Sequence, residues 1–310
     1  MKILLIGTGA LGCFYGGKMA RIGEDITFLS RGESFRTIKE KGIVVKSDLE
    51  ESFQTPVRII DTFPTNSQFD LVIIATKSYD VPSLVSQLPE SLLSSSYFMT
   101  LQNGLMSEDI LSEKLEPSRL LPATAFVALR KSEVNVINHT AGGRFQFGAY
   151  SGGEQKGFLD ELAGLLRHCQ IDTHFSESIV KMKWGKLVWN AAYNPLSTIT
   201  QLKLGAIITN PHGVKLLRTS MEETASIAEK AGYKLNDEFI EKQMDLPKDL
   251  YNFTTSMLQD YMNGKPLEIE AILGDLIRKG KTYGIPTPTH DHSYHLIQIL
   301  LQNRGHPMEG

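Results

Sequence analysis

Three polar residues recur every four positions inside an otherwise apolar segment. Lys186, Asn190 and Asn194 stand at i, i+4 and i+8 within residues 182–196, MKWGKLVWNAAYNPL. On a helix this spacing places the three side chains on one face, one turn apart. A buried lysine is costly unless it finds partners, and working sites are where folded proteins most readily tolerate it. The stripe is therefore a candidate catalytic site; the alternative is a solvent-facing stripe, against which the flanking aromatic residues count.

A glycine-rich turn follows the first apolar run of the chain. Residues 3–6, ILLI, lead directly into GTGALG, and apolar residues then recur at helical spacing. Gly7 permits a tight turn, Gly9 lets the main chain approach a pyrophosphate, and Gly12 lets the helix pack close to the strand. The free N–H groups at the helix start attract phosphate. The order strand, turn, helix predicts a dinucleotide site formed by Gly7, Thr8, Gly9, Ala10, Leu11 and Gly12.

The second strand of this unit, residues 26–29, indicates which dinucleotide is bound. It ends in Ser30 and Arg31, where an NAD-binding unit would place an Asp or Glu to hold the ribose 2′-hydroxyl. Arg31 can instead pair bidentately with a 2′-phosphate, and Ser30 can add a hydroxyl donor. The sequence therefore predicts NADP(H) as the cofactor. A solvated loop cation is the alternative interpretation of Arg31.

Composition excludes several classes of partner. The 310 residues include 32 basic and 35 acidic ones, for a net charge of -3, so neither a nucleic acid nor an anionic membrane is an expected partner. No apolar run approaches the roughly 18 residues that a membrane span needs, and the chain begins with a core strand rather than a signal segment. Cys13 and Cys169 lack metal-ligand spacing, and the histidines at 290, 292 and 295 fit no familiar zinc motif, so no metal is expected. We expect a cytoplasmic protein with a small-molecule ligand.

The elements that must position these residues change character along the chain. Residues 70–76, DLVIIAT, are apolar on both faces, as in a buried parallel strand. A further strand at 97–101 ends in QNG at 102–104. Because ligands bind outside the carboxyl ends of the strands of an open α/β sheet, we expect one crevice to hold the following residues. They are Gly7, Arg31, Lys77 and Asn103.

The second half of the chain has a different periodicity. Strands are predicted at 121–129, 134–139 and 144–149, and these could be antiparallel. From Ser178 onward helical periodicity dominates, with helices expected at 179–193, 213–231, 250–262, 267–283 and 290–303. The predicted fold class is α/β: a Rossmann-type doubly wound sheet followed by an all-helical domain. We place the NADP-binding domain at 1–177 and the helical substrate and catalytic domain at 178–310.

Six motifs in order give the chain a family resemblance over roughly residues 1 to 300. They are GTGALG at 7–12, TK at 76–77, QNG at 102–104, WGKLVWNAAYNPLSTIT at 184–200, SMLQD at 256–260 and LEIEAILG at 267–274. Together they resemble the ketopantoate reductases (2-dehydropantoate 2-reductases). The resemblance implies a helical domain like that of 6-phosphogluconate dehydrogenase. It also implies NADPH-dependent reduction of 2-dehydropantoate to (R)-pantoate, a step of pantothenate synthesis.

The resemblance also implies roles for single residues. Lys186 matches the family's catalytic lysine, which protonates the carbonyl oxygen at C2 of the substrate, and Glu268 matches the acid near that oxygen. Asn190 and Asn194 match residues that hold the polar groups of the substrate. Ser256 matches a ligand for its carboxylate.

The remaining matched positions concern the coenzyme and the edge of the substrate site. Arg31 and Lys77 match positions that contact NADP. Asn103 matches the asparagine beside the nicotinamide and is assigned to both the coenzyme and the substrate site. One position departs from the family pattern, because Phe253 stands three before the serine of SMLQD, where a polar residue is usual. Asn252, its neighbour, is therefore the candidate for that contact.

Two other functions are compatible with the sequence. One is an NADPH-dependent reductase of another branched 2-keto acid, or a β-hydroxyacid dehydrogenase of similar two-domain build. The other is a sensor that binds NADP(H) without turnover; a proton donor in a buried stripe counts against it. The sequence leaves a homodimer open.

Overall fold

The chain forms two compact units. The computed structural model describes residues 1–64, 68–152 and 155–304. The first unit comprises Met1–Gln102 and Met106–Val180, and the second comprises Asn103–Leu105 and Lys181–Gly310. Residues 305–310 of the predicted second domain lie outside the described residues. Three residues that follow a strand of the first unit thus pack with the second.

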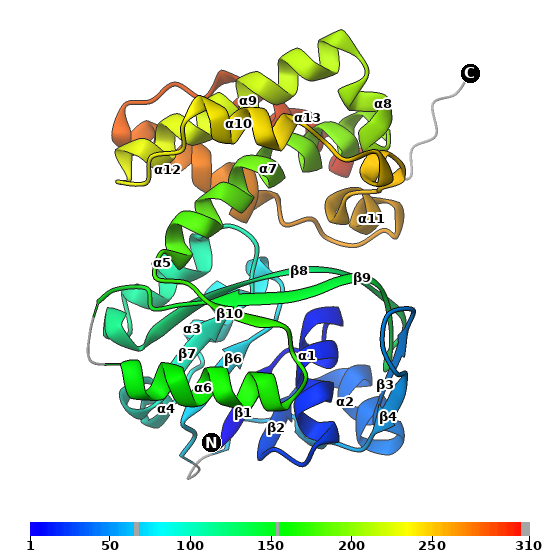
Figure 1. Cartoon of the computed structure of the whole chain (residues 1–310), viewed down its shortest axis with the longest axis vertical. Coiled ribbons are helices and arrows are strands. Elements are labelled where there is room, and N and C mark those ends of the chain that lie inside the picture. Colours follow the sequence, from blue (N-terminus) through cyan, green and yellow to red (C-terminus); the bar gives the residue numbers. More distant parts are fainter. Residues whose placement is uncertain (65–67, 153–154, 305–310) are drawn as a thin grey trace. The chain divides into compact units, whose positions relative to one another are not determined.

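A mixed sheet forms the centre of the first unit (Figure 1). Its order in the described residues is β4-β3-β9-β8-β7-β6-β1-β2-β5, and β10 pairs with β9. The run from β5 to β8 is parallel, whereas β9 is antiparallel to β8. The strands are β1 (Ile3–Ile6), β2 (Ile26–Leu29), β3 (Ile43–Ser47), β4 (Phe53–Thr55), β5 (Arg58–Ile60), β6 (Leu71–Ile74), β7 (Tyr97–Thr100), β8 (Leu120–Glu133), β9 (Val136–Phe147) and β10 (Thr173–Phe175).

Helices cover both faces of this sheet. In β1, Ile3 and Leu5 point into one apolar core, and Leu4 and Ile6 point into another. Such alternation between two buried faces explains the uninterrupted apolar run in the sequence. The first core receives α1 (Ala10–Arg21), α2 (Gly32–Lys41) and α6 (Lys156–His168). The second receives α3 (Val81–Val85), α4 (Glu90–Ser95) and α5 (Met106–Ser112). The predicted doubly wound architecture is confirmed.

The long hairpin of β8 and β9 differs from its prediction. Its antiparallel pairing is confirmed, but the two strands expected at 134–139 and 144–149 are one strand. Gly142 and Gly143, with φ of 71° and 137°, lie within the strand at a register shift instead of forming a turn. A Cβ on Gly142 would lie 2.3 Å from the carbonyl oxygen of Phe126 on β8. Glycine is needed there for an irregularity in the ladder, which lets the strand continue.

The second unit is helical throughout its described residues. Its helices are α7 (Ile179–Thr200), α8 (Leu204–Ile208), α9 (Pro211–Lys230), α10 (Asp237–Met244), α11 (Ser256–Met262), α12 (Asp275–Tyr283) and α13 (Pro288–Gln302). A 3₁₀ segment spans Lys248–Asn252 and a π-helical turn spans Glu270–Gly274. Asn210 caps α9 by accepting from the N–H of His212 at 2.9 Å. The all-helical character predicted for this half is therefore confirmed.

Two predicted helices are divided in the structure. The helix expected at 250–262 was wrong, because the Thr255 side chain accepts from the N–H of Leu258 at 3.3 Å and starts a new helix at Ser256. The helix expected at 267–283 contains the π-helical turn before α12 begins. A local hydrogen bond, which periodicity does not reveal, sets the start of α11.

The helix that carries the polar stripe is longer than predicted. We expected it to end at Tyr193, but α7 continues through Pro195 to Thr200. A proline removes the N–H that would bond the carbonyl four residues earlier. Here that carbonyl belongs to Ala191, and the hydroxyl of Ser220 on α9 donates to it at 3.1 Å. A side chain from a neighbouring helix thus replaces the missing backbone bond.

Candidate active site

The stripe on α7 lies in a largely buried environment. Asn190 and Asn194 are 6% and 1% exposed, and Lys186 is half-buried. Val188 and Tyr193 of the same helix belong to the apolar core formed with α9 and α10. This burial explains why the segment is apolar on most sides, and the stripe does not form a solvated face.

The electrostatic surroundings of Lys186 favour loss of its proton. Its pKa is lowered to about 8, chiefly by burial and in addition by the ammonium of Lys183, one turn earlier. The carboxylate of Glu268 acts in the opposite direction. Lys183 is itself only 3% exposed. The result is an ammonium that stays largely protonated at neutral pH and releases its proton more readily than a surface lysine.

The residues of the QNG tripeptide, 102–104, contact two different parts of the chain. The side-chain amide of Gln102 donates to the carbonyls of Ile74 and Thr76, each at 2.9 Å, and so fixes the end of β6. The Asn103 side-chain nitrogen donates to Oε2 of Glu268 at 3.3 Å. Gly104 has a φ of 76°, and a Cβ there would lie 2.2 Å from the Ala271 carbonyl oxygen. Asn103 and Gly104 thus hold the segment that carries Glu268.

That segment continues into the π-helical turn at Glu270–Gly274. The Glu270 carboxylate accepts from the guanidinium of Arg278 at 2.9 Å and from the hydroxyl of Tyr294 on α13. A Cβ on Gly274 would lie 2.4 Å from Oε2 of Glu270, so a larger residue there would displace this carboxylate. π-Helical turns are rare and occur often at functional sites. The turn lies two residues after Glu268 and anchors its segment to α12 and α13.

Asn194 is the clearest unsatisfied group in the stripe. Both its side-chain oxygen and its nitrogen are buried, with no hydrogen-bond partner among the described residues. Its backbone carbonyl, in contrast, accepts from the hydroxyl of Thr198 at 2.8 Å. A buried amide without partners is destabilising, and native proteins usually satisfy such groups. The Asn194 side chain is thus suited to bind a polar group of a ligand.

Two other predicted substrate-binding residues lie at the surface of the second unit. Ser256 is exposed at the first position of α11, and Asn252 is exposed at the end of the 3₁₀ segment. Phe253 is partly buried against the apolar core, and its carbonyl accepts from the N–H of Leu204. The structure brings Lys186, Glu268 and Asn103 together, whereas Ser256 and Asn252 are held on a separate segment.

The glycine-rich loop of the first unit has the geometry of a phosphate cradle. A Cβ on Gly7 would lie 2.6 Å from the Thr76 nitrogen, and one on Gly12 would lie 2.1 Å from the Gly7 carbonyl oxygen. A Cβ on Gly9 would meet nothing nearer than the Ala75 carbonyl oxygen at 3.7 Å. The fold therefore requires the first and third glycines, whereas the second keeps open the approach to α1. Among the described residues no side chain caps the N-terminus of α1, so its N–H groups suit a pyrophosphate.

The other predicted coenzyme residues follow neighbouring strands of the first unit. The hydroxyls of Thr8 and Ser30 lie 2.6 Å apart, which links the loop to the end of β2. Arg31 is exposed, and its guanidinium donates to the Gln87 side chain at 3.0 Å. Lys77 directly precedes a 3₁₀ turn after β6. Asn103 differs from these residues, because its contacts belong to the second unit.

The structure adds residues that the sequence reasoning did not select. Lys183 precedes Lys186 by three residues, a helical spacing that could have identified it. Gln102 stood inside a recognised motif, but its bonds to β6 depend on tertiary structure. Lys131, whose ammonium contacts the glycine-rich loop, had no signal in the sequence.

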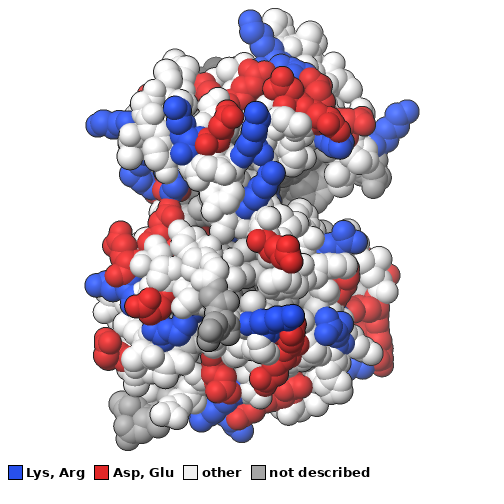
Figure 2. Space-filling view, turned by 60° about the vertical axis from the view of Figure 1, so that its left-hand side comes forward, with Lys and Arg blue, Asp and Glu red and all other residues white. Residues whose placement is uncertain are grey.

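Basic and acidic side chains are interspersed over the face in Figure 2. None of the helices in the described residues combines the length and apolarity of a membrane span. His290 is buried in the first turn of α13 and shares a hydrogen bond of 2.9 Å with the Thr224 hydroxyl on α9, so it supports helix packing.

Comparison with protein families gives two matches that together cover most of the chain. The family model described as ketopantoate reductase PanE/ApbA matches residues 3–152. The model described as ketopantoate reductase PanE/ApbA C terminal matches residues 178–301.

Individual relatives align over nearly the whole length. The 2-dehydropantoate 2-reductase of a Nostoc species is 27% identical over 303 residues, which cover 96% of this chain and 95% of the relative. That of Pyrococcus horikoshii is 28% identical over 291 residues, 93% of each chain. The crystal structure of 2-dehydropantoate 2-reductase from Geobacter metallireducens has a TM-score of 0.88 at 27% identity, covering 97% of this chain and 100% of that one. A D-mandelate dehydrogenase with NADH and anilino(oxo)acetate, 22% identical with a TM-score of 0.88 over 98% of this chain and 99% of that one, shares the fold.

Proposed function

Because the chain belongs to the ketopantoate reductase family, we propose that it is an oxidoreductase that reduces 2-dehydropantoate to (R)-pantoate, a step of pantothenate synthesis. One observation carries the proposal. Lys186, half-buried and with its pKa lowered to about 8, shares one face of α7 with Asn190 and with the unsatisfied amide of Asn194. This face offers a proton donor beside groups that bind polar atoms, which reduction of a keto acid requires.

Lys186 is the general acid in this proposal. When bound, a nicotinamide coenzyme would supply the hydride for C2 of the keto acid, so that negative charge would develop on the carbonyl oxygen. The ammonium of Lys186 stabilises that charge and donates the proton that completes the hydroxyl. The neutral amine regains its proton from solvent after product release. The lowered pKa makes this donation more favourable than from an ordinary lysine.

Glu268 and Asn103 keep the donor in position. The carboxylate of Glu268 favours the protonated form of Lys186, and the Asn103 amide, which donates to Oε2 of Glu268, fixes its orientation. We assign Glu268 to the catalytic group with Lys186. Its loss should impair both substrate binding and turnover.

The remaining predicted residues would bind the other polar groups of the substrate. Asn190 and Asn194 would bind its oxygen atoms, and the Asn194 amide supports this role because it has no hydrogen-bond partner among the residues that the structure describes. Ser256 would hold the carboxylate, because its hydroxyl is exposed at the start of a helix. Asn252 would add a polar contact, since Phe253 packs into the apolar core.

We infer that the coenzyme is NADP(H). The exposed guanidinium of Arg31 and the hydroxyl of Ser30 follow β2, where a carboxylate would select NAD. The pyrophosphate would bind the loop from Gly7 to Gly12, including Thr8, Ala10 and Leu11, and Lys77 would add a cation. In this assignment residues 1–177 bind coenzyme, residues 178–310 bind substrate and carry out proton transfer, and the enzyme acts in the cytoplasm.

The test is a spectrophotometric assay of coenzyme oxidation with 2-dehydropantoate and a panel of branched and aromatic 2-keto acids. We expect the highest kcat/KM with 2-dehydropantoate and a much lower KM for NADPH than for NADH. A higher kcat/KM with another keto acid would reassign the substrate. This alternative is worth testing because Phe253 stands where the family usually has a polar residue. Binding of NADPH without turnover of any keto acid would indicate a sensor and contradict the proposal.

A further inference from the structure

Arg31, the residue assigned to the 2′-phosphate, is held by a side chain from another segment of the first unit. It follows β2, and its guanidinium donates to Oε1 of Gln87 at 3.0 Å. Gln87 comes shortly after α3, which follows β6 along the chain. In the sheet β1 lies between β2 and β6, and the glycine-rich loop follows β1. The hydrogen bond therefore joins the segments that follow the two neighbours of β1.

The side-chain amide of Gln87 has a defined orientation. Its nitrogen donates to the carbonyl oxygen of Ser83 at 2.9 Å and to the Ser83 hydroxyl at 3.0 Å. A backbone carbonyl can only accept and a guanidinium can only donate, so the amide nitrogen faces Ser83 and the amide oxygen faces Arg31. The N–H of Gln87 also donates to the carbonyl of Leu84 at 3.0 Å. Gln87 is thus an acceptor anchored to α3.

This contact orients Arg31 without neutralising its charge. Gln87 is uncharged, whereas a carboxylate in its place would form an ion pair with the guanidinium. A guanidinium has five N–H donors in a fixed fork, and the bond to Gln87 takes one of them. The fork can pair bidentately with a phosphate. Because a long exposed side chain loses rotamer freedom when it binds a ligand, holding Arg31 in advance raises its affinity for the phosphate.

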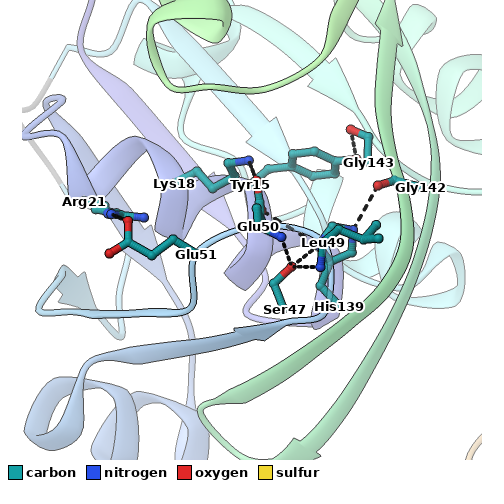
Figure 3. A network of polar contacts seen from close by, with 10 residues as sticks. All are labelled: Tyr15, Lys18, Arg21, Ser47, Leu49, Glu50, Glu51, His139, Gly142 and Gly143. Atoms are coloured by element: carbon teal, nitrogen blue, oxygen red, sulfur yellow. Dashed lines mark hydrogen bonds and ion pairs between the residues drawn. The ribbon is translucent and has the colours of Figure 1, made fainter.

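The helix after the glycine-rich loop, α1, is fixed by separate contacts (Figure 3). Lys18 of α1 pairs with Glu50 at 2.6 Å, and the hydroxyl of Tyr15 donates to the carbonyl of Gly143 in β9 at 3.4 Å. Gln87 is not a member of this network. A change at Gln87 should therefore affect binding of the 2′-phosphate and leave α1 in place.

We propose that Gln87 is a positioning residue for coenzyme selection, which holds the guanidinium of Arg31 where the 2′-phosphate binds. The inference rests on the NADP(H) preference of the proposed function. NADH has a ribose hydroxyl in place of this phosphate, so Gln87 contributes to the affinity for NADPH and not to that for NADH. Ser83 contributes indirectly, because it fixes the amide of Gln87.

The test measures Kd values for NADPH and NADH by calorimetry, together with melting temperatures. Gln87→Met removes the amide but keeps the length of the side chain. We expect it to lower affinity for NADPH by about threefold to tenfold, the size of one net hydrogen bond. Affinity for NADH should stay unchanged, as should the melting temperature, since Gln87 is exposed. Gln54→Met removes another exposed glutamine of the first unit and is the matched control.

A second variant tests the importance of a neutral acceptor. Gln87→Glu keeps an oxygen that can accept from Arg31 but adds a negative charge. The new carboxylate would compete with the 2′-phosphate for the guanidinium and repel it. The loss of NADPH affinity should therefore exceed that in Gln87→Met and should shrink at high salt, because ions screen the repulsion.

A double-mutant cycle shows whether Gln87 acts through Arg31. Arg31→Met should by itself remove most of the preference for NADPH. Adding Gln87→Met to this variant should have no further effect, because the residue that Gln87 positions is already absent. Additive losses would overturn the inference. Unchanged NADPH affinity in Gln87→Met would overturn it too, as would an equal loss for NADPH and NADH.

Failure of the proposed coenzyme would give a different result. Wild-type protein that binds NADH as tightly as NADPH, with no change in Arg31→Met, would contradict the NADP(H) assignment and the inference together. A preference for NADPH that Arg31→Met removes and Gln87→Met does not would leave the coenzyme assignment intact and overturn only the role of Gln87.

Discussion

The two units present their candidate sites by different chemical means. In the first unit the site consists of main-chain groups, since glycines bring the loop to the N-terminus of α1. A Cβ added at Gly9 would lie 3.7 Å from the Ala75 carbonyl oxygen, so the loop is open at this residue. In the second unit the site consists of side chains. The pKa of Lys186, the central one, depends on burial and on its neighbours Lys183 and Glu268. The first site should therefore be sensitive to added atoms, and the second to removed ones.

The largest expected effect concerns the side-chain site. Lys186→Ala should lower kcat by about a hundredfold to ten-thousandfold, the usual contribution of a general acid, while the Kd for NADPH stays close to that of the wild type. Steady-state kinetics and coenzyme titration measure the two quantities. Lys181→Ala, an exposed lysine on the same helix, is the control and should keep full activity. A near-normal kcat in Lys186→Ala would remove the proton donor from the mechanism.

The main-chain site can be probed by adding one methyl group at two glycines. Gly9→Ala should fold normally, because its Cβ meets only ordinary contacts, yet bind NADPH about tenfold or more weakly, a loss of about 1.4 kcal/mol or more. Gly12→Ala should instead lower the free energy of unfolding by about 1–3 kcal/mol, because its Cβ would lie 2.1 Å from the Gly7 carbonyl oxygen. Calorimetric titration and urea unfolding provide the measurements. Unaltered NADPH affinity in Gly9→Ala would mean that this loop does not approach the coenzyme.

The helix that carries the stripe depends on a hydroxyl from α9. Ser220→Ala should lower the free energy of unfolding by about 1–3 kcal/mol, because the Ala191 carbonyl freed by Pro195 would lose its donor in a buried place. Thr219→Ala removes an exposed hydroxyl from the same helix and is the matched control. If both variants unfold at the same urea concentration, the Ser220 bond does not stabilise α7.

The smallest expected effect is on the pH profile. Reduction needs the protonated form of Lys186, so kcat should fall as pH rises through about 8. Lys183→Met removes a positive charge that lowers this pKa and should move the midpoint upward, whereas Glu268→Gln should move it downward, each by about one unit or less. Opposite shifts in the two variants would confirm that the buried neighbours tune the amine. Identical profiles would assign the alkaline limb to another group.

Sequence reasoning captured features that repeat or that restrict the backbone. The glycine motif, the two-faced apolar strand and the helical period of the second half were sufficient to predict the fold class and to recognise the family. The failures have local physical causes: Gly142 and Gly143 form an irregularity instead of a turn, and Pro195 lies inside α7 because Ser220 compensates for it. In the candidate site, the spacing of Lys186, Asn190 and Asn194 was sufficient to place them on one face of a helix.

The partners of these residues could not be predicted in the same way. Glu268 and Asn103 are 165 residues apart, and their hydrogen bond exists only because the chain folds the tripeptide after β7 onto the segment before the π-helical turn. Lys131 and Thr8, which are 123 residues apart, likewise meet only in the folded chain. Long-range pairs of this kind leave no periodic trace in the sequence. The strand ends pointed to Asn103, but only the resemblance to a family pointed to Glu268.

The three residues 103–105 also determine how the polypeptide can be cut. A fragment that begins at residue 178 would lack the Asn103 amide that meets Glu268 and the Gly104 backbone that approaches Ala271. The halves of this protein are thus interlaced along the chain, and expressing the C-terminal portion by itself would yield an incomplete scaffold. A domain swap between relatives would have to exchange residues 103–105 together with the helical unit that they contact.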